Sequence, residues 1–247
     1  MSSYLLLIGA ALGAGLMNAV AGGGSFLTFP ALVFTGVPSV IANASSTVAL
    51  FPGVFASAWA YRKDFKTPEG VSFRATLVAS ILGGVTGALL LLYTSQRYFD
   101  VIIPWLLLIA TLTFAFGRQA AALLKRRSGI SPKTLIVVQF LAAVYGGYFG
   151  GAVGIILLAA WSLAGLSDIH ALNANRTLLG GVMNAAAVVC FIIAGKIWWL
   201  QTAMMLVAAV AGGYLGARVA RRMNPSVIRA IVVIVSVTVT IAFFLRT

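Results

Sequence analysis

Long apolar stretches with few charges alternate with short polar connections along the whole chain. Six of the stretches have the length of about 20 residues that a helix needs to cross the hydrocarbon core of a membrane. They cover residues 41–61, 75–94, 99–117, 171–194, 199–217 and 227–245. The pattern therefore predicts six spanning helices in an all-α polytopic membrane protein.

Two further stretches, residues 4–36 and 134–166, are too long for one span. Each has 33 residues without a charge, so a straight helix would be about 50 Å long against a hydrocarbon core of about 30 Å. Small residues gather near the middle of each, at 22–24 in the first and at 150–154 in the second. Because glycine ends helices readily, we expect two shorter helices around a glycine-rich break in each stretch.

The two halves of the chain repeat one another. At a shift of 130 residues, Gly24 aligns with Gly154 and Asn43 with Asn173. Internal repeats of this kind are common in secondary transporters. We therefore divide one integral membrane domain into repeat one (1–117), a basic cytoplasmic linker (118–133) and repeat two (134–247).

The basic connections distinguish two topologies. If both long stretches crossed the membrane, the chain would have eight transmembrane helices, and the basic connection 218–229 would face away from 62–74 and 118–133. If each stretch instead folds back as a re-entrant hairpin, each repeat has three full spans and the repeats are inverted. All three basic connections then share one side, as the positive-inside rule requires of the cytoplasmic side. We favour the hairpins, with both termini outside, and keep eight transmembrane helices as the alternative.

Composition excludes most other classes of protein. The 247 residues are 61% hydrophobic and 9% charged, against about 25% charged in soluble domains. The net charge of +13 lies in the membrane-flanking connections, so we expect no nucleic-acid partner. One histidine, one cysteine and four acids near the connections are too few for a metal set or a catalytic group. We therefore expect no enzyme and no cofactor, and the lack of carboxylates at depth argues against a cation pathway.

Several motifs resemble one known family. They are Asn18 to Leu32, Ala42 to Gly53, Leu172 to Ala174, Gly180 to Asn184 and Gly195 to Trp198. Over the whole chain the sequence resembles the sulfite exporter TauE/SafE family. The resemblance implies a membrane permease, in a family where some members export sulfite, sulfoacetate or other small sulfur-containing anions. One departure is that the second repeat has Ala152 and Val153 within its glycine cluster, and Ala160 where the first has Pro30. The second break is therefore expected to be less unwound or to differ in ligand geometry.

The helix that follows each break offers an anion site. Its first amides have no acceptor within the helix, and a helix N-terminus carries about half a positive charge. Glycine lets the backbone approach a ligand closely, so two such termini at the interface of inverted repeats would bind an oxyanion. For the three consecutive glycines Gly22, Gly23 and Gly24, a ligand-binding break is favoured over a role in helix packing. The glycine pairs 83/87 and 212/216 are instead predicted to pack helices.

Polar residues near the breaks complete the predicted site. Asn43 and Asn173 are interpreted first as helix N-caps, whereas Asn18 and Asn184 lie in apolar runs and need a helix or a ligand as partner. Arg176 is either an electrostatic attractor or a snorkelling side chain paired with Asp168. The candidate substrate-binding residues are Asn18, Gly22, Gly23, Gly24, Ser25, Asn43, Ser46, Thr47, Gly150, Gly154, Asn173, Asn175, Arg176, Thr177 and Asn184.

The combined prediction is an anion permease of the bacterial cytoplasmic membrane. Its partners are the lipid bilayer and a small substrate, expected to be a sulfur-containing oxyanion such as sulfite or an organosulfonate. An inside-negative potential, worth about 2.3 kcal/mol per charge per 100 mV, favours export of an anion. Another small organic anion, import instead of export, and a homodimeric assembly are left open.

Overall fold

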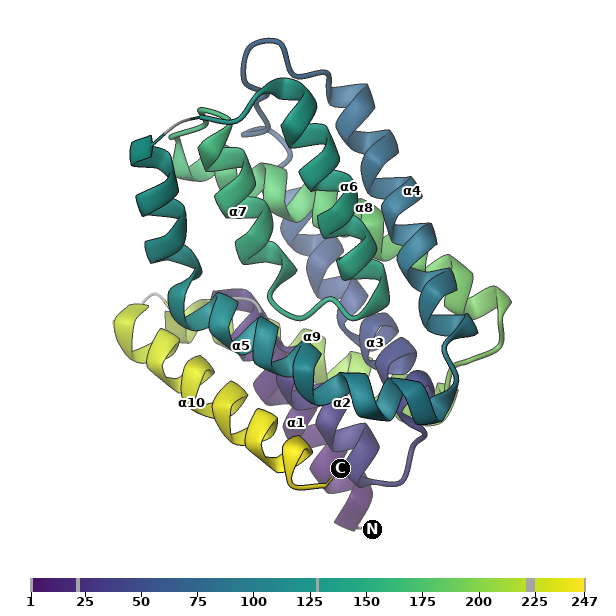
Figure 1. The fold of residues 1–247 in the computed structure, drawn as a ribbon. Coiled ribbons are helices and arrows are strands. Elements are labelled where there is room, and N and C mark those ends of the chain that lie inside the picture. The colour runs from purple at the N-terminus through teal and green to yellow at the C-terminus, as the bar shows by residue number, and fades with distance from the viewer. Residues whose placement is uncertain (1, 21–22, 128, 221–224, 247) are drawn as a thin grey trace. The chain divides into compact units, whose positions relative to one another are not determined.

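A computed structural model describes residues 2–20, 23–127, 129–220 and 225–246. This part of the chain forms ten α-helices and no strand (Figure 1). The helices are α1 (Ser2–Val20), α2 (Ser25–Phe34), α3 (Ser39–Ala60), α4 (Phe73–Tyr93), α5 (Gln96–Arg127), α6 (Pro132–Tyr148), α7 (Val153–Leu163), α8 (Ile169–Ile193), α9 (Trp199–Ala220) and α10 (Pro225–Phe244).

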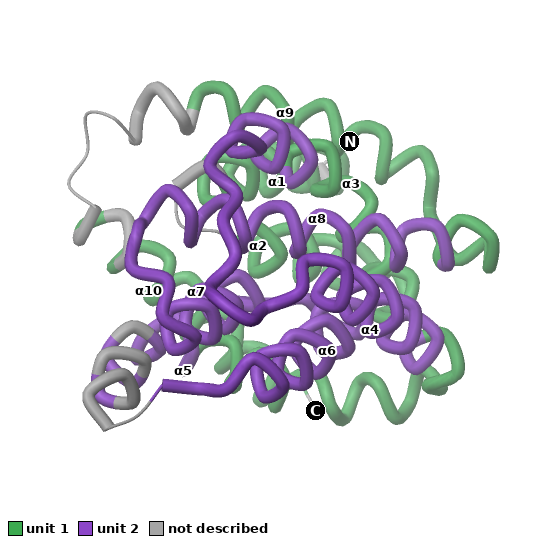
Figure 2. The backbone as a smooth tube through the Cα atoms, turned by 90° about the horizontal axis from the view of Figure 1, so that it is seen from above, with its two compact units in different colours: residues 1–53, 92–111, 191–247 green, residues 54–91, 112–190 purple. Residues whose placement is uncertain are grey.

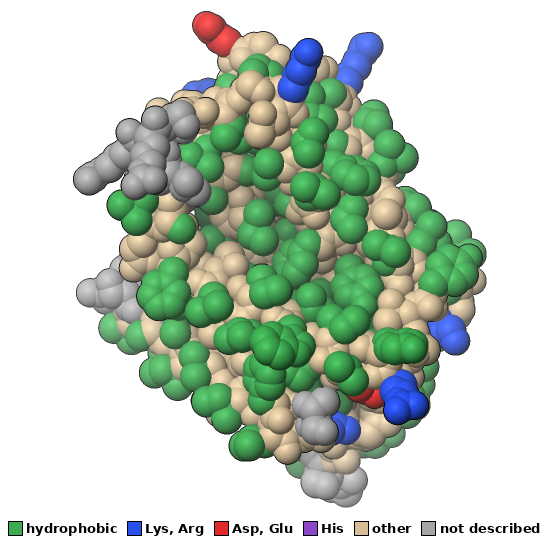
Figure 3. Space-filling model, viewed as in Figure 1, with side chains coloured by type: hydrophobic (Ala, Val, Ile, Leu, Met, Phe, Trp, Pro, Cys, Tyr) green, Lys and Arg blue, Asp and Glu red, His purple; other side chains and the backbone are tan. Residues whose placement is uncertain are grey.

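All six predicted spans are helical. The segments Ser39–Ala60, Phe73–Tyr93, Gln96–Gly117 and Ile169–Ile193 are long and apolar enough to cross a membrane. The other two predicted spans form α9 and α10. Large apolar side chains such as Phe55, Trp105 and Val207 are exposed, and such side chains cover much of the face seen in Figure 3. A lipid-facing surface explains this exposure, and the all-α polytopic class is confirmed.

Helix α5 extends past the predicted span into the segment 118–133 and ends at Arg127. Alanine, leucine, glutamine, lysine and arginine are strong helix formers, and the sequence after Gly117 consists of them. The next helix begins at Pro132, where Ser131 accepts a hydrogen bond from the amide of Thr134 as an N-cap. Proline in the first turn suits a helix start, since its missing amide proton would have had no partner there.

Both long stretches are broken where the glycines predict. The described part of α1 ends at Val20 and α2 begins at Ser25, while α6 ends at Tyr148 and α7 begins at Val153. Gly23 and Gly150 have φ angles of +93° and +81°, in the left-handed region that glycine tolerates. Ala152 has a φ of +59°, which is unusual for a residue with a side chain.

The helices on either side of each break contact one another. At the open end of the second pair, the amide of Ile130 donates to the carbonyl of Leu163 at 3.1 Å. Ile130, two residues before α6, is therefore adjacent to Leu163, the last residue of α7, and this stretch returns to the place where it began.

The chain forms two compact units (Figure 2). Unit 1 contains residues 1–53, 92–111 and 191–247, and unit 2 contains 54–91 and 112–190. Unit 1 holds the α1–α2 pair together with α9 and α10, and unit 2 holds the α6–α7 pair together with α4 and most of α8. Each unit thus combines one broken stretch with helices from the other half of the chain.

Glycines bring helix backbones together inside each unit. In unit 1 a Cβ at Gly212 of α9 would overlap the carbonyl of Leu12 in α1. In unit 2 a Cβ at Gly83 would lie 2.6 Å from the carbonyl oxygen of Phe140, and one at Gly87 would overlap the carbonyl of Val144. The predicted packing role is confirmed for these three glycines, while the surroundings of Gly216 lie outside the described part.

A buried hydrogen-bond chain holds the α6–α7 pair on α4. The indole Nε1 of Trp161 donates to Gln139 Oε1 at 3.0 Å, and Gln139 Nε2 donates to Ser80 Oγ at 2.9 Å. Ser80 Oγ in turn donates to the carbonyl of Thr76 at 2.8 Å. All four side chains are fully buried, so these bonds fix the second break relative to α4.

Candidate functional site

The first break is closed by side chains from both neighbouring helices. Asn18 Oδ1 accepts from the amide of Gly24 at 2.8 Å. Thr28 Oγ1 lies 2.6 Å from Ser46 Oγ and donates to the Gly24 carbonyl at 3.3 Å. Three predicted site residues, Asn18, Gly24 and Ser46, are therefore brought together. Thr28 was not among the predicted site residues. Its position as a polar residue in the first turn of an otherwise apolar helix could have indicated it.

Asn18 takes the structural role that its apolar surroundings allowed. It accepts the amide of Gly24, the residue directly before α2, which leaves one donor fewer for a ligand at this break. The amide of the adjacent Ser25 donates to none of the described residues. A Cβ at Gly24 would lie 2.7 Å from the carbonyl oxygen of Ala14, so this glycine also permits close packing. Gly22 lies outside the described residues.

The capping interpretation of Asn43 and Asn173 is wrong. Their helices begin four residues earlier, at Ser39 and Ile169, so both asparagines lie in the second turn. Their carbonyls accept hydrogen bonds from the hydroxyls of Thr47 and Thr177, at 2.9 and 2.8 Å. Pro38 before α3 and Asp168 before α8 mark the true starts, and Asp168 Oδ1 accepts from the amide of His170 at 3.0 Å.

The second break presents amides that lack an acceptor in the described chain. The phenol of Tyr145 donates to the carbonyl of Gly151 at 2.7 Å and holds the break against α6. The amides of Gly151, Ala152 and Gly154 donate to none of the described residues. Successive amides around residues of positive φ form a concave, anion-binding arrangement. Gly150 and Gly154 were predicted at this site. Gly151 and Ala152 were not, although the run of small residues from Gly150 to Ala152 could have indicated them.

Arg176 lies at this break. A Cβ built at Gly154 would be 3.2 Å from Arg176 Cδ and 3.7 Å from its Nη1. The half-buried arginine side chain therefore runs along the start of α7, where Gly154 leaves room for it. The guanidinium and the helix N-terminus contribute positive charge to the same part of unit 2.

Asn175 holds a connection instead of the break. Its Nδ2 donates to the carbonyl of Lys66 at 2.8 Å, while its buried Oδ1 has no partner in the described chain. Lys66 Nζ also lies 3.3 Å from Asp168 Oδ2. The backbone amide of His170, followed by Lys66, lowers the pKa of Asp168. Asn184 is half-buried and makes no side-chain hydrogen bond to the described residues.

The described residues contain no group of three or more His, Cys, Asp or Glu side chains that could hold a metal ion. The chemistry at both breaks comes from backbone amides, hydroxyls, amides of asparagine and one guanidinium. Such groups bind and orient a ligand, and they offer no acid–base pair in the described structure.

A comparison with protein families matches residues 7–243 to the family described as Sulfite exporter TauE/SafE. The chain belongs to this family. It is 30% identical over 230 residues to a probable membrane transporter protein of Haemophilus influenzae, with 92% of this chain and 89% of the relative covered. It is 28% identical over 224 residues to the probable membrane transporter protein YfcA of Escherichia coli K12, covering 90% and 82%. The probable membrane transporter protein YunE of Bacillus subtilis is 25% identical over 263 residues, with 96% of both chains covered.

Family and relatives confirm the coarse function predicted from the sequence. The chain is a multi-pass transporter of the bacterial cytoplasmic membrane and not an enzyme. A transporter acts on a small molecule within lipid, so a small-molecule substrate and the bilayer are its partners.

Proposed function

We propose that the chain is a permease for a small anion, and that the second break binds this anion. The observation that carries the proposal is the position of Arg176 beside Gly154, at a helix start whose first amides donate to none of the described residues. The proposed substrate is a sulfur-containing oxyanion such as sulfite or an organosulfonate.

The chemistry of the break supports an anion over a cation. Hydrogen bonds from amides and a guanidinium to an oxyanion are charge-assisted, and each contributes about 1.5–3 kcal/mol. A cation at the same place would face the positive end of α7 and the guanidinium of Arg176. Sulfite and sulfonates offer three oxygen acceptors in a compact group, which matches several donors within a short stretch of backbone.

The membrane potential supports export as the direction. A potential of 100 mV, negative inside, contributes about 2.3 kcal/mol to the outward movement of one negative charge. An anion exporter therefore needs no coupling ion. Import remains the alternative direction, and another small organic anion the alternative substrate.

We also propose that the chain has two inverted repeats, each with a re-entrant hairpin and three spans. Within unit 2, the Ile130–Leu163 hydrogen bond supports a long stretch that ends on the side where it began. The Lys66–Asp168 ion pair supports the same topology, because eight spanning helices would put these two connections on opposite membrane sides.

The test of the anion permease uses purified protein in liposomes. Vesicles are preloaded with sulfite or methanesulfonate, and efflux is measured under an imposed inside-negative potential without a pH gradient. We expect Arg176→Gln to raise the anion concentration at half-maximal efflux by about tenfold or more. A tenfold change corresponds to about 1.4 kcal/mol. Arg74→Gln is the matched control, since it removes the same charge from an exposed position in unit 2.

The result distinguishes a binding role from a structural one. If Arg176→Gln and Arg74→Gln have the same thermal midpoint and the same anion concentration at half-maximal efflux, the second break does not bind the anion. If the unmodified protein transports neither sulfite nor methanesulfonate, the proposal that the chain is a permease for these anions is wrong. Efflux that ignores the potential and follows a pH gradient would contradict potential-driven export.

A further inference from the structure

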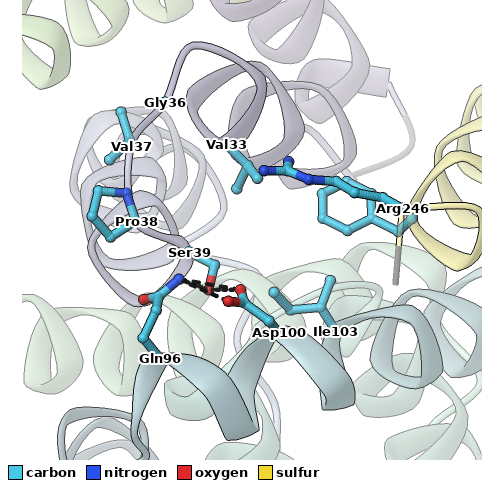
Figure 4. A pocket seen from close by; sticks show the side chains of 10 residues that line it. Val33, Gly36, Val37, Pro38, Ser39, Gln96, Asp100, Ile103 and Arg246 are labelled. Carbon is cyan, nitrogen blue, oxygen red and sulfur yellow. Dashed lines mark hydrogen bonds between the residues drawn. The ribbon is translucent and has the colours of Figure 1, made fainter.

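Unit 1 contains a cavity of about 400 Å³ apart from the two breaks (Figure 4). It lies where α2 and α10 end and where α3 and α5 begin, so its walls come from four helix ends. Residues from both repeats line it. Its volume lies in the range of about 300–1,000 Å³ that is usual for small-molecule sites.

One wall carries a carboxylate held by neutral groups. Ser39 Oγ donates to Asp100 Oδ1 at 2.5 Å. Gln96 Nε2 donates to Ser39 Oγ at 2.6 Å, and it also contacts both carboxylate oxygens of Asp100, Oδ1 at 3.1 Å and Oδ2 at 3.3 Å. The amide of Val40 donates to Gln96 Oε1 at 3.3 Å, which orients the glutamine. Asp100 is thus held in place, and no cation of the described residues forms an ion pair with it. A carboxylate has about four acceptor positions, so Oδ2 retains capacity for a further donor.

The other wall carries a guanidinium. Arg246 reaches across the opening from the end of α10, and Figure 4 shows it separated from the Ser39–Gln96–Asp100 group. Its guanidinium carbon lies 5.7 Å from the centre of the Phe34 ring. No carboxylate of the described residues lies within 4 Å of the guanidinium. The lining also contains the apolar side chains of Val33, Val37, Ile103 and Phe243.

We propose that this cavity binds a small zwitterion that carries an ammonium and an acidic group on a short aliphatic chain. The ammonium pairs with Asp100, the acidic group pairs with Arg246, and the chain contacts the apolar lining. An anion without an ammonium group would be attracted by Arg246 but repelled by the carboxylate of Asp100. An amine without an acidic group would be attracted by Asp100 but repelled by Arg246. Specificity therefore arises from repulsion of singly charged ligands as well as from attraction.

This site is distinct from the anion site proposed at the second break. The charges of Asp100 and Arg246 cancel, so the cavity discriminates against the simple oxyanions that Arg176 attracts. Because it lies at helix ends, where both charged side chains are exposed, water can reach it. The proposal therefore adds a second ligand class to the transporter, and it stands or falls independently of the transported anion.

The test compares three probes with one carbon chain. Purified full-length protein in detergent is titrated by calorimetry with 3-aminopropanesulfonate, propanesulfonate and propylamine. We expect the zwitterion to bind at least tenfold more tightly than either singly charged probe. Asp100→Asn should abolish this preference and improve binding of propanesulfonate, because the repelling charge is gone while an acceptor for Ser39 remains. Arg246→Gln should weaken both probes that carry the sulfonate.

Arg97→Gln is the matched control, because Arg97 is exposed on the first turn of α5 and does not line the cavity. Equal affinity for the three probes, or zwitterion binding that survives both cavity variants, would overturn the proposal. So would an equal loss of binding in Arg97→Gln. If Asp100→Asn does not yield folded protein, Arg246→Gln decides alone, since its exposed side chain is not part of the core. Normal anion efflux in liposomes without zwitterion binding would reject this inference and leave the anion permease intact.

Discussion

A methyl group at Gly83 tests the close packing of α4 against α6. Its Cβ would lie 2.6 Å from the carbonyl oxygen of Phe140 and 2.6 Å from Ala143 Cβ. Non-bonded carbon atoms are normally about 3.5–4.0 Å apart. Gly83→Ala therefore requires the two helices to separate by close to an ångström, and neither obstacle can rotate away because one is backbone and the other a Cβ.

The free-energy cost follows from two opposing effects. Overpacking of a close contact costs about 1–3 kcal/mol, and a rigid obstacle favours the upper part of this range. Alanine gains up to about 1 kcal/mol over glycine in a helix. The net destabilisation is about 2 kcal/mol, which corresponds to a fall of about 4–8 °C in the thermal midpoint of a chain of this size. Separation of the helices would also lengthen the Gln139–Ser80 hydrogen bond between them.

The measurement is the thermal midpoint of the purified protein in detergent, followed by tryptophan fluorescence. Gly9→Ala is the matched control, because a Cβ at this helical position would meet nothing within 4 Å. We expect the control to keep or raise the midpoint while Gly83→Ala lowers it. Equal midpoints for the two variants would refute the claim that glycine is required for this helix contact.

Two further predictions concern unit 2. Gln139→Leu removes a partner from Trp161 Nε1 and from Ser80, and leaving a buried donor unpaired costs about 1–3 kcal/mol. We therefore expect a lower thermal midpoint and altered tryptophan emission. The control Thr86→Val, on the helix α4 that carries Ser80, should change neither. An unchanged midpoint in Gln139→Leu would contradict the structural role of these hydrogen bonds. Cysteines placed at Thr67 and Ser167, both exposed, should react with an impermeant thiol reagent from the same, cytoplasmic side in a Cys190→Ser background. Labelling from opposite sides would restore eight spanning helices.

Local backbone chemistry made much of the fold predictable. The six spans, the two broken stretches and the positions of both breaks follow from apolar runs of sufficient length and from glycine clusters at 22–24 and 150–154. The errors were also local. Asn43 and Asn173 resembled helix caps by residue type, but Pro38 and Asp168 set the helix starts one turn earlier. Helix α5 is longer than the predicted span because the residues after Gly117 are good helix formers.

The sequence by itself determined that this is a helical membrane protein of a transporter family and where its helices break. Only the tertiary structure decided which side chains meet, because a contact between distant segments depends on which faces of their helices pack. Arg176 lies on Gly154, and Gln139 joins Ser80 to Trp161, through packing that no spacing along the chain encodes. Likewise Asp100 and Arg246, which were no more than charges beside connections in the sequence, share a cavity because four helix ends converge there.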